Sequence, residues 1–120
     1  MPLGSMPLFK FIPKPFDDKN ITYAKYNDDL DAFLNTGNMI VVNLPDVHPQ
    51  LMIKKITRES KNNYYYRAEH ENNSLIWLDL SRTGNTQLGS LHINNHIYKI
   101  IISDVDAKIT RLSADVFGED

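Results

Sequence analysis

The sequence predicts an α+β fold in which strands dominate: an antiparallel meander forming a curved sheet or small open barrel, with one short helix near residues 28–36. Three observations support this prediction. Segments rich in β-branched or aromatic residues recur from residue 39 to residue 112. Short polar turns separate them, as between antiparallel neighbours. Only one segment carries helix signals, and 120 residues is the length of one domain.

The N-terminal region is expected to be extended. Residues 1–5 are interpreted as the remnant of an expression tag, because a second Met-Pro-Leu follows at once from Met6. Residues 6–20 contain three prolines, which disfavour helix, and three phenylalanines that we expect to pin this arm onto a core or a partner. The single globular α+β domain is expected over residues 21–120.

The helix prediction depends on end signals and a narrow apolar face. Asn27 is a suitable N-cap, two aspartates follow in the first turn, and Gly37 is a suitable C′ residue. A helix of two to three turns must pack against something larger. The apolar positions follow helical spacing at Leu30, Phe33 and Leu34.

Seven strands are expected after the helix. Asn94 and Asn95 fit a two-residue hairpin turn, because asparagine tolerates positive φ. Both faces of the segment 74–80 are apolar, so we expect this strand to be central and covered on both sides. One face is expected to carry Leu75, Trp77 and Leu91. The expected strands are 39–44, 51–57, 64–69, 74–80, 87–93, 96–102 and 108–112.

Composition excludes several classes of function. The net charge of −2 gives no electrostatic footprint for nucleic acid or an anionic membrane. The absence of cysteine excludes disulfides, thiolate metal sites and a cysteine nucleophile. No apolar run approaches the ~18 residues of a membrane span. We therefore expect no nucleic-acid partner, no membrane partner and no cofactor.

The histidines and acids do not predict an active site. In the expected hairpin His92 and His96 point to opposite faces and cannot share a metal, and His48 and His70 lie in turns. The aspartates at 28, 29 and 31 are explained by a helix start and a solvated face. No serine lies in a G-x-S-x-G elbow. We expect no catalytic residues, no metal site and no enzymatic activity.

Aromatic residues offer one alternative function. Tyr64, Tyr66 and Trp77 are candidates for an exposed surface that binds a carbohydrate or another ligand by stacking. The competing interpretation is an ordinary strand with tyrosines on alternate faces, which the missing basic patch favours. This hypothesis requires the three rings to be exposed together.

The second half of the chain carries a distinctive order of motifs. The segments in this order are Asn43-Leu44-Pro45, Tyr64-Tyr65-Tyr66-Arg67-Ala68, Asn73 to Leu80, Leu88 to Ile93 and Ile97 to Ile100. This order resembles the propeptides of secreted reprolysin-like zinc metalloproteases, a metzincin group common in bacteria. Those propeptides show a strand ending in Leu-Pro, then spaced tyrosines, then a Ser-Leu strand and a Gly-containing hairpin. The chain departs at Ala68 and Asn95, where the family often has glycine.

The resemblance implies a non-catalytic prodomain that assists folding of a zinc metalloprotease and blocks its cleft until removed. The implied partner is the protease catalytic domain, in cis or in trans. Blocking uses strand addition or a zinc-facing group. Many such propeptides use a cysteine as the zinc-facing group, and others use a carboxylate. Because this chain lacks cysteine, the resemblance implies a carboxylate. Acids near the C-terminus are better candidates than Asp104 or Asp106. The C-terminal candidates are Asp115, Glu119 and Asp120.

Other expectations stay open. One alternative is a free-standing inhibitor or immunity-type protein. It would bind its target as the prodomain does, but would be encoded alone. The zymogen interpretation places the protein outside the cytoplasm, secreted or periplasmic, if a signal peptide has been removed. A native start at Met6 would make it cytoplasmic. A homodimer through an open sheet edge is a further expectation.

Overall fold

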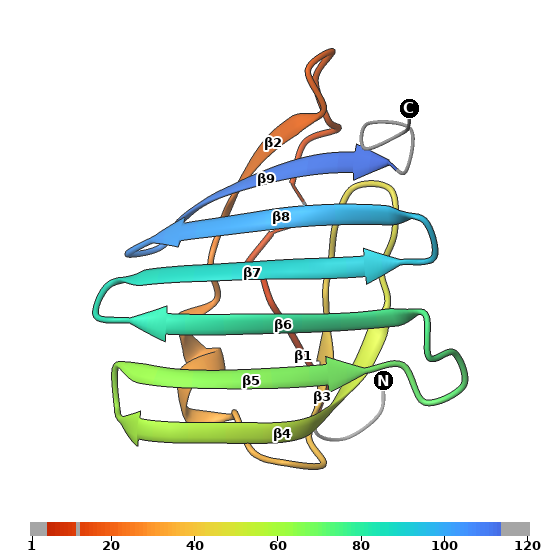
Figure 1. Ribbon diagram of the computed structural model, residues 1–120. Helices are drawn as coiled ribbons and strands as arrows, with labels where there is room; N and C mark the ends of the chain where they lie inside the picture. Colours follow the sequence, from red (N-terminus) through yellow and green to blue (C-terminus); the bar gives the residue numbers. More distant parts are fainter. Residues whose placement is uncertain (1–4, 12, 114–120) are drawn as a thin grey trace, which may run out of the picture.

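The computed structural model describes residues 5–11 and 13–113, which form one curled, nine-stranded mixed sheet (Figure 1). The strand order is β1-β3-β4-β5-β6-β7-β8-β9-β2. Strands β4 to β9 make one wall of a half-barrel, and β1, β2 and β3 lie behind it. The strands are β1 (Ser5–Pro7), β2 (Ile21–Lys25), β3 (Met39–Val41), β4 (Gln50–Ser60), β5 (Asn63–Glu69), β6 (Ile76–Thr83), β7 (Thr86–Ile93), β8 (His96–Ser103) and β9 (Asp106–Ser113).

The meander is confirmed from β4 to β9, where each strand pairs antiparallel with the next. The predicted hairpin at residues 94–95 is also confirmed, because Ile93 pairs with His96 and Asn94 has a φ of 54°. Turns with positive φ close two other hairpins, at Gly84 and Asp104. Local turn chemistry therefore sets the register of this wall.

Two strands, β1 and β2, were not predicted, and β1 makes the sheet mixed rather than antiparallel. Strand β1 pairs parallel with β3, and β2 pairs antiparallel with β9. Ser5, assigned above to a tag remnant, is the first residue of β1 and pairs with Met39. Both pairings join segments far apart in the chain, so no turn signal announces them.

The predicted helix over 28–36 is wrong: the segment forms only a 3₁₀ turn, η1 (Asp28–Ala32). The Asn27 side chain does accept from the Asp29 N–H, as an N-cap should. The turn stops because the Phe33 carbonyl accepts from the Asn38 side chain at 2.6 Å. The Gly37 N–H, which would continue a helix, donates to Ile53 instead.

Strand β6 is central, as predicted, but only one of its faces is covered. Leu78 and Leu80 are buried inside the half-barrel. Trp77 and Asp79 lie on the outer face and are half-buried. Leu91 pairs with Leu78 and so faces inward, not beside Trp77 as expected. The fold has an outer sheet face with no layer packed on it in the described part of the chain.

The N-terminal segment bridges the two ends of the sheet. On one side the Leu8 N–H donates to the Val41 carbonyl at 2.9 Å, which extends the β1–β3 pairing. On the other side the Lys10 N–H donates to the Lys25 carbonyl at 2.9 Å. Leu8 and Phe9 are fully buried within the core. This segment therefore closes the half-barrel at one end.

The buried core fills the inside of the half-barrel and consists mainly of aliphatic and tyrosine side chains. Four polar residues are also buried among the described residues: Thr22, Asn27, Asn43 and Gln87. No helix in the described part of the chain is long and apolar enough to cross a membrane.

Candidate functional site

The predicted aromatic surface does not form. Tyr64 and Tyr66 are only 3% and 1% exposed, because their positions on β5 face the interior. Trp77 lies on the outer face, where it pairs with Glu69 and His92. The three rings therefore lie on opposite sides of the sheet and share no surface.

Trp77 itself offers no open ring face. The Arg67 guanidinium carbon lies 4.0 Å from the centre of the indole ring. The His92 ring stacks at 3.8 Å with its plane tilted by 10°. Two groups this close cannot occupy one face, so Arg67 and His92 cover opposite faces. A sugar or base has no indole face left to stack on.

The four histidines do not gather. His92 and His96 lie on opposite faces of the sheet, as the hairpin geometry predicted, and His48 is exposed in the loop before β4. No group of three or more metal-ligating side chains occurs among residues 5–11 and 13–113. The zinc-facing candidates Asp115, Glu119 and Asp120 lie outside the described residues.

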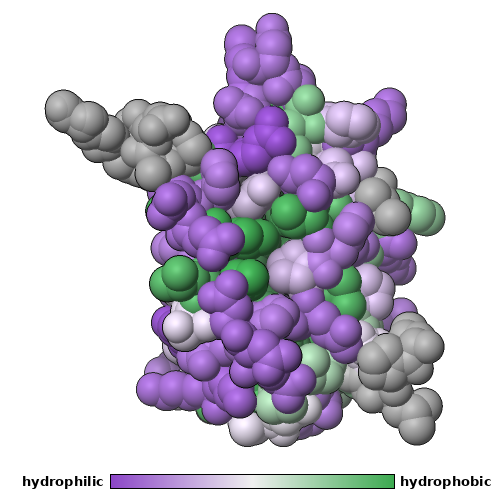
Figure 2. Space-filling view, turned by 90° about the vertical axis from the view of Figure 1, so that its right-hand side faces the viewer, coloured by the Kyte–Doolittle hydropathy of each residue, from purple (hydrophilic) through white to green (hydrophobic). Residues whose placement is uncertain are grey.

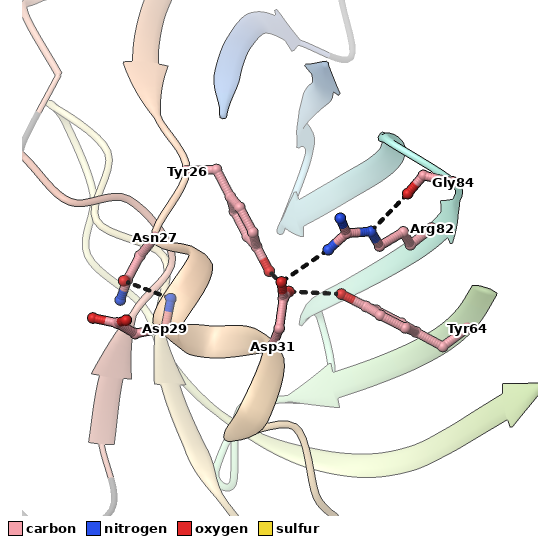
Figure 3. Close-up of polar contacts among 7 residues, drawn as sticks. All are labelled: Tyr26, Asn27, Asp29, Asp31, Tyr64, Arg82 and Gly84. Carbon is pink, nitrogen blue, oxygen red and sulfur yellow. Dashed lines mark hydrogen bonds and ion pairs between the residues drawn. The ribbon is translucent and has the colours of Figure 1, made fainter. Parts of the chain in front are cut away.

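Asp31 joins η1 to the sheet at one end of the half-barrel (Figure 3). The Tyr26 and Tyr64 hydroxyls donate to Asp31 Oδ1 at 2.6 and 3.1 Å. The Arg82 guanidinium donates to Asp31 Oδ2 at 3.0 Å and to the Gly84 carbonyl at 2.9 Å. Burial, helped by the neighbouring tyrosines and Asp31, raises the pKa of Tyr26 far above its usual value. These groups are mutually satisfied, which indicates a structural anchor.

The opposite end of the half-barrel carries a second polar cluster. Figure 2 shows this end of the molecule, where a group of hydrophobic side chains is surrounded by hydrophilic ones. Asp46 accepts from the Tyr98 hydroxyl and from Arg111, both at 2.9 Å. Arg111 also donates to Asn20 and lies over the Phe16 ring at 4.5 Å. The adjoining hollow has a volume of about 340 Å³. This cluster fastens the arm and the loop before β4 onto the meander.

A groove of about 700 Å³ lies between the N-terminal arm and strand β2. Backbone hydrogen bonds tie the arm to β2 near the ends of the groove. The Lys10 N–H donates to the Lys25 carbonyl, and the Asp17 N–H donates to the Ile21 carbonyl. Between these ties two prolines have no N–H with which to pair. The apolar lining comprises Phe11, Pro13, Pro15, Ile21, Tyr23, Ala24 and Ala107.

An apolar band continues from the groove across the outer face of the sheet. It consists of Phe11, Tyr23, Ile101 and Leu88, four of the six large hydrophobic side chains that are exposed among the described residues. Leu88 pairs with Ile101, Ile101 with Lys108, and Lys108 with Tyr23, so three members stand in one row across four strands. Tyr23 and Phe11 both line the groove.

The apolar band has the chemistry of a docking surface. Its members are 49% to 70% exposed, and within the row Lys108 separates Ile101 from Tyr23. The flanking outer-face residues are hydrophilic, including Ser90, Lys99 and Ser103. Contiguous apolar patches with polar rims are typical of protein-interaction sites.

Sequence reasoning missed the apolar band, although one signal was available. In β8 three isoleucines follow one another at 100, 101 and 102. Side chains of a strand alternate between faces, so a strand with one buried face must expose the middle one. Tyr23 carried no such signal, because β2 itself was not predicted.

Comparisons with known proteins identify a fold neighbour but no family. No family model matches the chain, and no curated protein matches it. A chain in the solved structure of a chaperone–substrate complex has a similar fold, with a TM-score of 0.65 and 10% sequence identity. The similarity covers 82% of this chain and 80% of that chain.

Proposed function

We propose that this chain is a non-catalytic binding domain for a protein partner, which docks on the apolar band and the adjoining groove. The observation that carries the proposal is the gathering of four exposed large hydrophobic side chains along one row of the outer sheet face and in the adjoining groove. Isolated exposed apolar residues are common on protein surfaces. A group of large ones close together is unfavourable in water, and a binding function explains why it is exposed.

The fold neighbour supports a role in binding polypeptides. That protein was solved in a chaperone–substrate complex, and its likeness extends over most of both chains. A half-barrel that exposes an outer sheet face can bind another polypeptide by surface contact. Assistance to folding and inhibition both need only such binding.

The finer form of the proposal is the prodomain suggested by the sequence. In that form the partner is a zinc metalloprotease catalytic domain, which the chain helps to fold and whose cleft it blocks. Asp115, Glu119 and Asp120 follow β9 directly in the sequence and are the carboxylates that could face the zinc. The form also predicts that the protein acts outside the cytoplasm.

The test is a titration of the chain into an active reprolysin-like zinc protease, with residual peptidase activity as the readout. We expect stoichiometric inhibition and, for one of the three C-terminal carboxylates changed to Ala, a loss of inhibition with binding retained. The refolding yield of the denatured protease with and without the chain measures assistance to folding. The absence of both binding and inhibition at micromolar concentration would refute the prodomain form.

A free-standing inhibitor or immunity-type protein is the alternative within the same class. It uses the same docking surface, and the two forms differ in how they are encoded. A reading frame that continues past Asp120 into H-E-x-x-H-x-x-G-x-x-H supports the prodomain.

A further inference from the structure

Lys108 stands inside the apolar band rather than at its rim. On the outer face it pairs with Ile101 on one side and with Tyr23 on the other. Neighbouring strands lie about 4.8 Å apart, so the row from Leu88 to Tyr23 spans about 14 Å. Any partner that covers both Ile101 and Tyr23 must also cover the lysine between them.

Covering Lys108 constrains the chemistry of the partner. Removing an ammonium group from water costs several kcal/mol unless a countercharge replaces the lost hydration. Within the described residues no carboxylate lies within ion-pair distance of Lys108. Asp106, two residues away on the same face, is engaged by Lys25. The countercharge must therefore come from the partner.

The surroundings of the apolar band reinforce this requirement. Lys99 lies on the same outer face and Lys14 lines the groove, and both are exposed without an ion pair among the described residues. Two aspartates line the groove, and Asp106 is paired with Lys25. The other, Asp17, has no ion pair among the described residues, and its carboxylate accepts hydrogen bonds from the backbone N–H groups of Lys19 and Ile21. The unpaired charge beside the apolar band is thus mainly positive, although the whole chain carries −2.

We propose that the apolar band docks an acidic-apolar polypeptide segment, in which a carboxylate that pairs with Lys108 stands between apolar side chains that cover Ile101 and Tyr23. The inference rests on the proposed protein-binding function and names the chemistry of the bound segment. In this arrangement the apolar contacts supply affinity, and the carboxylate selects the partner and sets its register.

The test selects a random dodecapeptide library displayed on phage against the full chain. Enriched peptides are then synthesised and their dissociation constants are measured by fluorescence anisotropy. We expect Asp or Glu to be enriched between apolar residues. Lys108→Glu should weaken binding at least tenfold, and replacement of the peptide acid by Lys should restore binding to that variant.

Matched variants separate the possible failures. Lys61→Glu makes the same charge reversal in the β4–β5 turn, away from the apolar band, and should leave affinity unchanged. Loss of binding in Leu88→Ser with no effect of Lys108→Glu would keep the docking surface and overturn the carboxylate pairing. Peptides insensitive to both changes, or no enriched peptide, would overturn the inference, and the protease titration then decides the proposed function separately.

Discussion

At the scale of single residues, Asp31 is the group on which one end of the half-barrel depends. Its carboxylate accepts from two tyrosine hydroxyls and from a guanidinium, and these donors come from three separate segments (Figure 3). The Arg82 side chain is only 12% exposed, so loss of its partner would leave a largely buried cation.

Asp31→Ala should therefore destabilise the protein strongly. We expect the free energy of unfolding to fall by about 3 kcal/mol, because the buried donors lose their acceptor together. Asp28→Ala is the control: it lies on the same turn but is exposed, and should change stability by no more than about 0.5 kcal/mol. Urea unfolding measures both variants. Equal effects would contradict the structural role of Asp31.

His92 should make stability depend on mild acid. Burial lowers the pKa of His92 below its usual value, an effect that Asp79 offsets in part and Arg67 reinforces. The folded state disfavours the charged His92 ring. The contribution of His92 to the free energy of unfolding is therefore complete above about pH 6.5, and it is lost as pH falls toward the lowered pKa. His92→Asn should remove this part of the pH dependence.

Trp77 provides the readout for that titration, because it is the sole tryptophan and stacks on His92 at 3.8 Å. We expect its emission to change with pH around a midpoint below 6.5, and the change to vanish in His92→Asn. A midpoint at or above 6.5 would show that burial does not govern this histidine.

At the scale of elements, the N-terminal arm has two parts with different roles. Phe9 is fully buried, and its backbone N–H and carbonyl both bond to the Asn43 side chain, at 3.0 and 2.9 Å. Two residues later Phe11 is 70% exposed and lines the groove. The arm thus closes the core with one phenylalanine and presents another to solvent.

Paired substitutions should separate these roles. Phe9→Ala should lower the free energy of unfolding by about 3 to 5 kcal/mol, because it empties a packed site. Phe11→Ala should change it by no more than about 0.5 kcal/mol and should instead weaken partner binding. Urea unfolding and the peptide assay measure the two effects. A stability loss at Phe11 as large as that at Phe9 would contradict this division.

The elements that sequence reasoning could predict are those with local signals. The hairpin at Asn94 and Asn95 was predicted with its register, since a two-residue turn fixes which residues pair. Strand β2 and its pairing with β9 were missed because the partners lie some 85 residues apart, Ile21 with Thr110 and Lys25 with Asp106. The helix signals at Asn27 were real, but a local hydrogen bond from the Asn38 side chain to the Phe33 carbonyl and a tertiary bond from the Gly37 N–H to the Ile53 carbonyl overrode them.

The candidate site was less predictable than the fold. The apolar band exists only because four strands meet in register, and one of them was not predicted. The aromatic surface failed for the related reason that alternation along β5 sends Tyr64 and Tyr66 inward. A site assembled across strands needs the sheet order before its residues can be named.

At the scale of the whole molecule, the tyrosine-rich interior should make the fold sensitive to alkali. Burial raises the pKa of Tyr26, Tyr66 and Tyr98 well above the usual value near 10. Because the unfolded chain loses these protons first, stability should fall as pH rises above about 10. Absorbance at 295 nm should show these residues ionising together with unfolding. Their ionisation in a chain that keeps its folded circular dichroism would contradict the buried assignment.

The most direct test of the central claim is hydroxyl-radical footprinting of the chain with and without a reprolysin-like zinc protease catalytic domain. We expect oxidation of Tyr23, Leu88 and Ile101 to fall on complex formation. Leu75 and Val105 are the control, since among the described residues they are the exposed large hydrophobic ones outside the apolar band. Protection of Leu75 and Val105 with no protection of the apolar band would contradict the claim that this surface binds the partner.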